Sequence, residues 1–223
     1  MRRALLLMAL MAATLVVTSG VALAVNKIGT DGPDTLKGTN GADNLLGRGG
    51  NDDLFGLGGR DSMLGGGGKD WVLGGNEQRP LGGDKNLVGG PGNDGVLGGE
   101  GSDNMLGGSG NDFADGDSGA DDISGGEGGD LLQDGERQNG ATDVLSGGGG
   151  NDVLDPFNDP AKRDVIACGS GFDRVLADTK DSVASDCEKV AVGPAAAQKL
   201  DQQIEASGFF DRLFEGLAPF PSG

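Results

Sequence analysis

A nine-residue repeat constrains this chain more than any other feature. Copies recur from Gly29 to Asp155, each beginning at a glycine, with Asp at position 6 and an apolar residue at position 8. Compositional bias alone would not keep two residue types in phase for so long, so a disordered Gly/Asp-rich tract is the weaker interpretation. The apolar series is Leu36, Leu45, Leu54, Met63, Val72, Val96, Met105, Ala114, Ile123, Leu132 and Leu154.

The repeat predicts an all-β fold. Its first six residues are rich in glycine and can adopt the positive φ angles of a tight turn. Its last three residues form a short strand, in which position 8 points one way and positions 7 and 9 point the other. Two repeats then complete one turn of a flattened coil with position 8 facing inward. We therefore expect a parallel β-roll, a β-helix solenoid of nonapeptide repeats, over residues 25–155.

The aspartates are the candidate metal ligands. In such a coil the Asp of one repeat lies above the Asp two repeats later, and the stacked carboxylates repel one another unless a cation lies between them. Ca²⁺ prefers about six to eight oxygen ligands, whereas Mg²⁺ demands a smaller octahedron. The chain has no His and only two Cys, which disfavours zinc and copper. We expect several Ca²⁺ ions bound by Asp34, Asp43, Asp52, Asp61, Asp70, Asp94, Asp103, Asp112, Asp121, Asp130, Asp143 and Asp152.

This pattern resembles the RTX (haemolysin-type) calcium-binding repeat, GGxGxDxUx, in which U is aliphatic. The resemblance covers about Gly29 to Asp155. It implies a secreted protein whose β-roll folds on binding extracellular calcium. It also implies that carbonyl groups of the glycine-rich turns, such as those of Gly49, Gly58, Gly90 and Gly108, complete the calcium ligands.

Three interruptions break the repeat. In the copy that begins at Gly74, Arg79 occupies the Asp position and the next copy is two residues short. We expect that turn to lack calcium, and the stretch 74–88 to form a defect in the roll or a hinge between two stacks. Insertions at 134–141 and 156–160 are expected to form loops on one edge.

The N-terminus resembles a secretory signal peptide at residues 1–24. Arg2 and Arg3 precede an apolar run over 4–17, and Ala22-Leu23-Ala24 offers a cleavage site before Val25. The alternative is a membrane anchor, but the run is shorter than the roughly 20 residues that span a bilayer. We expect a secreted, extracellular protein with no membrane insertion after cleavage.

The C-terminal part departs from the repeat in two segments. Residues 156–193 read as degenerate terminal repeats and resemble the terminal coil that closes some secreted RTX-repeat proteins. In an exported chain, Cys168 and Cys187 are expected to form a disulfide, the alternative being a reactive thiol pair. Residues 194–223 have apolar residues near helical spacing, which predicts a short helical tail that caps the roll or contacts a membrane surface.

Composition argues against several functions. Without His there is no usual general base, so Ser118 in the protease-like stretch Gly116–Gly119 lacks an activating partner. Because we also expect no catalytic domain outside the array, we predict that the protein is not an enzyme. A formal net charge of −18 opposes binding to nucleic acid.

Positions 7 and 9 carry an unexpected apolar signal. Simple alternation would expose these residues on the outer faces of the N-terminal half, where large apolar patches usually mark a partner surface. The alternative is that neighbouring side chains or the tail half-bury them. Beside the calcium-binding function, we therefore consider a structural or adhesive module that self-associates or binds a surface partner through Leu46, Phe55, Leu64, Trp71, Leu73, Leu97 and Leu106.

Overall fold

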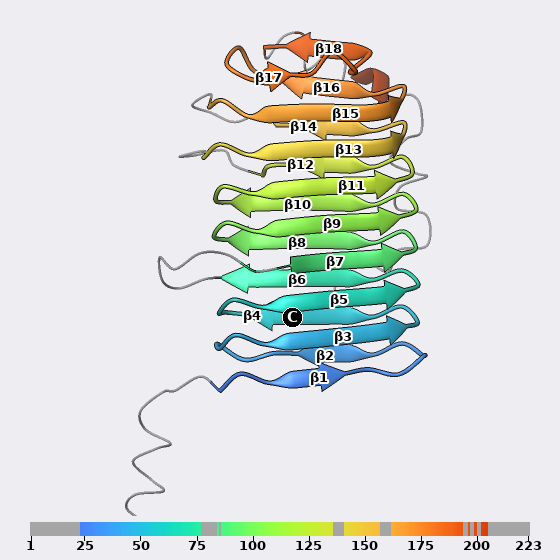
Figure 1. The fold of residues 1–223 in the computed structure, drawn as a ribbon, viewed down its shortest axis with the longest axis vertical. Coiled ribbons are helices and arrows are strands. Elements are labelled where there is room, and N and C mark those ends of the chain that lie inside the picture. Colours follow the sequence, from blue (N-terminus) through green and yellow to red (C-terminus); the bar gives the residue numbers. More distant parts are fainter. Residues whose placement is uncertain are drawn as a thin grey trace, which may run out of the picture.

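The computed structural model describes residues 23–76, 84, 86–135, 141–156, 162–193, 196, 199 and 202–204. These residues form two parallel nine-stranded sheets that face each other in a solenoid of about eight turns (Figure 1). Sheet A contains β1 (Asn26–Ile28), β3 (Asn44–Gly49), β5 (Ser62–Gly67), β7 (Asn86–Pro91), β9 (Asn104–Ser109), β11 (Asp122–Glu127), β13 (Val144–Gly150), β15 (Val165–Gly171) and β17 (Ser182–Val183). Sheet B contains β2 (Thr35–Lys37), β4 (Asp53–Leu57), β6 (Trp71–Asn76), β8 (Gly95–Glu100), β10 (Phe113–Ser118), β12 (Leu131–Gln133), β14 (Val153–Asp155), β16 (Arg174–Ala177) and β18 (Lys189–Val192).

The predicted parallel β-roll is confirmed, because consecutive strands alternate between the two sheets and each repeat pairs with the repeat two further along. The predicted strand length is wrong. Most strands continue from positions 7–9 into positions 1–3 of the next repeat, where residues such as Gly108 and Ser109 still pair with the following turn. Among the described residues, positive φ angles occur only at positions 2 and 4 of the repeat, for example 129° at Gly108 and 126° at Gly110.

The core is a thin double row of position-8 side chains between the sheets. Alternation along each strand points them inward, as predicted. They form one continuous buried cluster, which also includes Leu87, Leu145, Ile166, Val175 and Cys168. Since each repeat contributes a single aliphatic side chain, this core is only two side chains thick.

Outward-facing residues depart from the expected exposure. The position-9 residues of successive repeats lie alternately on the two sheets. The predicted apolar stripe is therefore divided into two columns, one on the outer face of each sheet. On sheet A, Ile28, Leu64 and Leu106 are 61, 40 and 38% exposed. On sheet B, Trp71 is only 6% exposed, which agrees with the alternative that other parts of the chain bury the outward-facing residues.

The interruption at 74–88 does not divide the roll. Strand β5 pairs with β7, and β6 pairs with β8, so both sheets run through it unbroken. The interruption falls between the end of β6 at Asn76 and the start of β7 at Asn86. Arg79 lies outside the described residues.

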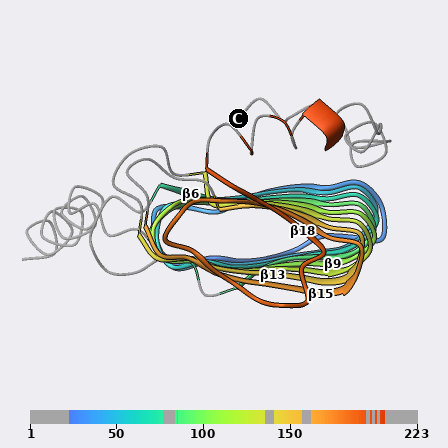
Figure 2. The same cartoon turned by 90° about the horizontal axis from the view of Figure 1, so that it is seen from above.

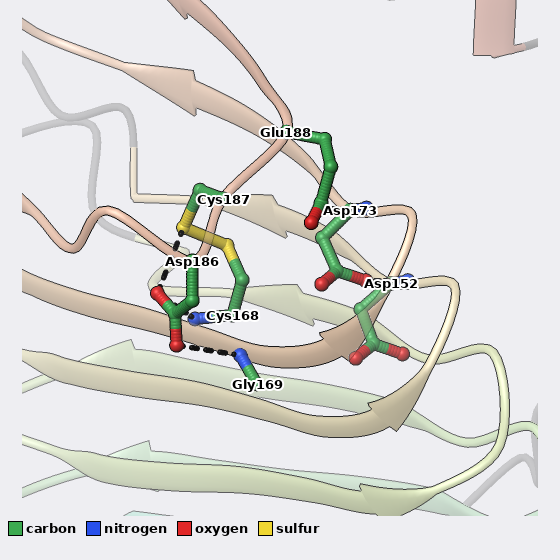
Figure 3. The surroundings of a disulfide bond; sticks show 7 residues. All are labelled: Asp152, Cys168, Gly169, Asp173, Asp186, Cys187 and Glu188. Carbon is green, nitrogen blue, oxygen red and sulfur yellow. Dashed lines mark hydrogen bonds between the residues drawn. A yellow bond between two sulfur atoms is a disulfide. The ribbon is translucent and has the colours of Figure 1, made fainter.

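The predicted disulfide is confirmed at the C-terminal end. Cys168 in β15 and Cys187 before β18 are joined with their Cα atoms 5.1 Å apart (Figure 3). Cys168 belongs to the buried core and Cys187 packs against it. The carboxylate of Asp186 accepts a hydrogen bond from the Gly169 N–H at 3.0 Å, which holds this last turn against β15.

Two expected segments fall largely outside the described residues. These are the signal peptide, of which only Leu23 and Ala24 are described, and most of the tail after Gly193. In the described part of the chain, no helix has both the length and the apolar character needed to cross a membrane.

The positive φ angle of Leu57 predicts that a substitution at this residue will stabilise the roll. Leu57 is at position 2 with φ 82°, where its register partner in the next turn is Gly75. Since a non-glycine residue in the left-handed region costs about 1–2 kcal/mol, Leu57→Gly should raise the free energy of unfolding by about 1 kcal/mol in urea titrations of the folded roll. Leu106→Gly is the matched control, because it removes an equally exposed leucine whose φ is not positive and should destabilise. Equal destabilisation by both variants would contradict the strain at Leu57.

Candidate metal centre

The position-6 aspartates do not project into solvent but fold inward over the glycine that begins the same turn. At Gly107, an added Cβ would lie 2.6 Å from Oδ2 of Asp112 and 2.6 Å from the carbonyl oxygen of Gly125. The same two contacts recur at the first glycine of most repeats. Glycine at position 1 is therefore the residue that makes room for the carboxylate.

Stacking of the turns places these carboxylates in two ladders, one at each edge of the roll. The members of each ladder come from every second repeat. All of them except Asp34, Asp181 and Glu188 are buried. The B ladder, whose members precede the sheet-B strands, contains Asp34, Asp52, Asp70, Asp94, Asp112, Asp130, Asp152, Asp173 and Glu188. The A ladder, whose members precede the sheet-A strands, contains Asp43, Asp61, Asp84, Asp103, Asp121, Asp143, Asp164 and Asp181.

One oxygen of each carboxylate is used to hold neighbouring turns together. The backbone N–H of Asp94 donates to Oδ1 of Asp112 at 2.9 Å, and the N–H of Asp112 donates to Oδ1 of Asp130 at 2.8 Å. The same bond links successive members throughout both ladders. Oδ1 thus has a structural role, and Oδ2 remains for another ligand.

Along the B ladder the second oxygen is buried without compensation. Oδ2 has no hydrogen-bond donor at Asp52, Asp70, Asp94, Asp112, Asp130, Asp152 and Asp173, within the part of the chain that the structure describes. Burying an ionised carboxylate is unfavourable unless it is paired or coordinates a metal. Burial accordingly raises the pKa of Asp70 to about 6, of Asp94, Asp130 and Asp152 to about 7, and of Asp112 to about 8.

The ladder ends differ from its middle. At the C-terminal end of the B ladder, Glu188 replaces aspartate and its Oε2 accepts the Asp173 N–H at 2.8 Å (Figure 3). At the N-terminal end, Asp34 receives hydrogen bonds from the backbone and side chain of Thr30, which lower its pKa. Asp43, at the N-terminal end of the A ladder, accepts the Val25 N–H at 2.5 Å.

The A ladder contains a denser group of carboxylates near β13. Asp134 occupies position 1 of its turn, where most other turns have glycine. Carboxylate oxygens of Asp134, Asp143 and Asp164 lie within 4.8 Å of one another, and all three residues are buried. Three negative charges this close raise the cost of burial further, and their oxygen donors suit a hard cation.

Asparagine at position 5 supports the same stacked turns. Oδ1 of Asn93 accepts the Asn111 N–H at 3.0 Å, and Oδ1 of Asn111 accepts the Gly129 N–H at 2.9 Å. At position 4, the carbonyl oxygen of Gly92 points at the next turn, 1.6 Å from where a Cβ on Gly110 would lie. These contacts hold the turn carbonyl groups and the carboxylates in a fixed arrangement.

All twelve predicted aspartates lie in the two ladders, but the sequence interpretation missed several members. Asp84, and not Arg79, supplies the ladder member before β7, accepting the Asp61 N–H at 2.7 Å, so a carboxylate is present in the turn that was expected to lack calcium. It escaped the pattern because one extra residue separates it from β7. Asp164 and Asp173 did carry the signal of Asp followed two residues later by an aliphatic residue, Ile166 and Val175.

Comparison with known families agrees with this geometry. The family model described as the RTX calcium-binding nonapeptide repeat (4 copies) matches residues 28–63, 47–77, 82–114, 97–132 and 139–155, which together exceed half of the chain. A comparison with curated proteins gave no match.

Proposed function

Because this chain belongs to the RTX calcium-binding repeat family, we propose that it binds several Ca²⁺ ions along the A and B ladders and that these ions drive the folding of the roll. The observation that carries the proposal is the row of buried Oδ2 atoms of the B ladder, which have no hydrogen-bond donor among the described residues. A row of buried anions needs either protons or cations, and carboxylate oxygens are ligands that Ca²⁺ prefers.

The donor set favours calcium over other metals. The candidate ligands are carboxylate and backbone carbonyl oxygens, which suit Ca²⁺, and the chain contains no histidine. When bound, Ca²⁺ would supply positive charge between carboxylates of adjacent turns. Asp52 to Asp173 would hold it on the B ladder, and Asp43 to Asp181 on the A ladder, with Asp134 as an additional ligand beside Asp143 and Asp164.

We further propose that the protein acts outside the cell. RTX repeats are typical of secreted bacterial proteins, and the expected signal peptide at residues 1–24 is consistent with export. In a calcium-poor cytosol the charged ladders would keep the chain extended, and calcium outside the cell would then fold it.

A second candidate function is that of a structural or adhesive module. The observation that favours it is an apolar column on the outer face of sheet A, in which Ile28, Leu46, Leu64, Val88 and Leu106 are successive register partners. Three of them, Ile28, Leu64 and Leu106, are exposed. Gel filtration with excess calcium would separate the candidates. Leu64→Ser with Leu106→Ser should reduce the oligomer size if this column joins copies of the chain, and leave it unchanged if calcium binding alone is the function.

A single ladder substitution tests the calcium proposal. Asp112→Asn keeps an oxygen that can accept the Asp94 N–H but removes the buried charge. In excess calcium this variant should bind one or two fewer ions by isothermal titration calorimetry and melt at a lower temperature. In calcium-free buffer at neutral pH it should instead stabilise the roll, because the pKa of Asp112 is raised to about 8 and its ionisation opposes folding.

The matched control is Asp122→Asn, which removes a charge from the exposed outer face of β11. It should leave calcium stoichiometry and melting temperature unchanged. If Asp112→Asn binds as much calcium as the parent chain, the ladder is not the binding site.

A further inference from the structure

The last full turn of the roll lies beyond the part of the chain that matches the calcium-binding repeat model. That match ends at residue 155, whereas the last turn comprises β16, residues 178–181 and β17. Seen from above, the coil is flattened, so the chain turns at two opposite edges (Figure 2). Because β15, β16 and β17 alternate between the sheets, the chain passes through one edge before β16 and through the opposite edge after it.

The disulfide closes the last turn at the first of these edges. Cys168 in β15 is joined to Cys187 on the edge that carries Asp173 and Glu188 of the B ladder (Figure 3). The two cysteines are 19 residues apart, and the loop that they enclose is one complete turn of the coil. Residues 178–181 form the opposite edge of this loop.

Three carboxylates meet at that opposite edge. Oδ1 of Asp181, the last member of the A ladder, accepts the Asp164 N–H at 3.1 Å, and its Oδ2 accepts the Asp178 N–H at 2.7 Å. Burial, and then the charge of Asp178, raise the pKa of Asp181, although hydrogen bonds with the backbone of both neighbours and with the Asp164 side chain lower it. The Asp181 carboxylate therefore lies close to the carboxylates of both Asp164 and Asp178.

Asp178 does not follow the bonding pattern of the ladders. It stands at position 2 of its turn, and it is 6% exposed. Its Oδ1 accepts the Lys180 N–H at 2.6 Å, but its Oδ2 is buried and has no hydrogen-bond donor among the residues that the structure describes. A buried ionised carboxylate is unfavourable unless it is paired or coordinates a metal. This unsatisfied oxygen, beside two further carboxylates, indicates a place for a cation.

We infer that Asp164, Asp178 and Asp181 bind one Ca²⁺ ion, which closes the last turn at the edge opposite the disulfide. The inference rests on the proposed calcium binding and adds to it the ligand Asp178 and a site outside the matched repeats. Each carboxylate offers about four lone pairs, so oxygens that accept N–H groups can also bind the ion, and Ca²⁺ takes about six to eight oxygen ligands, water included. A terminal turn has a neighbour on one side only, so one ion and one covalent bond hold this end of the solenoid.

Substituting Asp178 tests the inference through the disulfide as well as through ion binding. Asp178→Asn keeps an oxygen that can accept the Lys180 N–H but removes the charge. In the full chain with excess CaCl₂, this variant should bind one ion fewer by isothermal titration calorimetry. Dithiothreitol should also reduce its disulfide several-fold faster, as measured by alkylation of the released thiols. After EGTA treatment the variant and the parent chain should be reduced at similar rates, because neither then holds the ion.

The matched control is Asp117→Asn. Asp117 also stands at position 2 of a turn that leads from sheet B to sheet A, but its side chain is exposed. This substitution should leave the ion count and the reduction rate unchanged. Circular dichroism in the same buffer identifies the variants whose roll is folded.

Each outcome decides the inference. An unchanged ion count or an unchanged reduction rate in folded Asp178→Asn would overturn it, as would equal effects of the Asp178 and Asp117 substitutions. These results would leave the proposed function intact if the parent chain still folds with calcium, whereas a parent chain that binds no calcium would refute both. If Asp178→Asn does not fold, Asp178→Ser is judged by the same criteria.

Discussion

Removing calcium with EGTA should abolish most of the β-sheet circular dichroism of the purified protein and increase its hydrodynamic size. Neighbouring strands lie about 4.8 Å apart, and two ionised carboxylates at that spacing repel by about 3 kcal/mol at an effective dielectric constant of about 20. Each ladder repeats this repulsion many times along the roll. The total exceeds the 5–15 kcal/mol that is the usual stability of a folded protein.

Circular dichroism and gel filtration before and after chelation measure this effect. Excess CaCl₂ should restore the signal with a steep dependence on concentration, because the turns stack cooperatively. Mg²⁺ at the same ionic strength is the control and should restore little, since it fits a smaller octahedral site. A chain that stays compact and equally stable after exhaustive chelation would refute the calcium-driven folding proposed here.

Acid should partly replace calcium. In the calcium-free roll the pKa values of Asp94, Asp130 and Asp152 are raised to about 7 and that of Asp112 to about 8, from an ordinary value of 3.8. The folded roll therefore binds more protons than the unfolded chain between about pH 4 and pH 8. Its stability is greatest at the acidic end of this window and is lost as the pH rises through the folded-state pKa values.

Titrating the calcium-free protein from pH 8 to pH 4 should therefore increase its β-sheet signal. With calcium present the direction reverses, because protons compete with the ion, so less calcium should be needed at pH 8 than at pH 6. Asp112→Asn removes the group with the highest of these pKa values and should weaken both effects. Structure that is lost on acidification of the calcium-free chain would contradict the burial of these carboxylates.

The sequence was informative wherever a residue's role depends on its phase within the repeat. Position 8 identified the core from Leu36 to Leu154, and position 6 identified the members of both ladders from Asp34 to Asp152. It did not identify Asp84, because one extra residue, Lys85, separates this aspartate from β7 and breaks the spacing of the repeat. Nor could it show why glycine is preferred at position 1, since the contact that favours it depends on the inward fold of the Asp side chain.

The local repeat by itself determined the fold class, the core and the carboxylate stacks of this protein, because in a solenoid each repeat contacts only the repeats beside and above it. The tertiary structure alone decided features that depend on residues distant in the chain. Strand pairing extended the strands into positions 1–3, and packing of Ile204 buried Leu131 and Val153 on the outer face of sheet B. The repeat period indicates which side chains point toward the core, because that depends on neighbours along the chain. The burial of an outward-facing side chain depends on which distant segment packs over it.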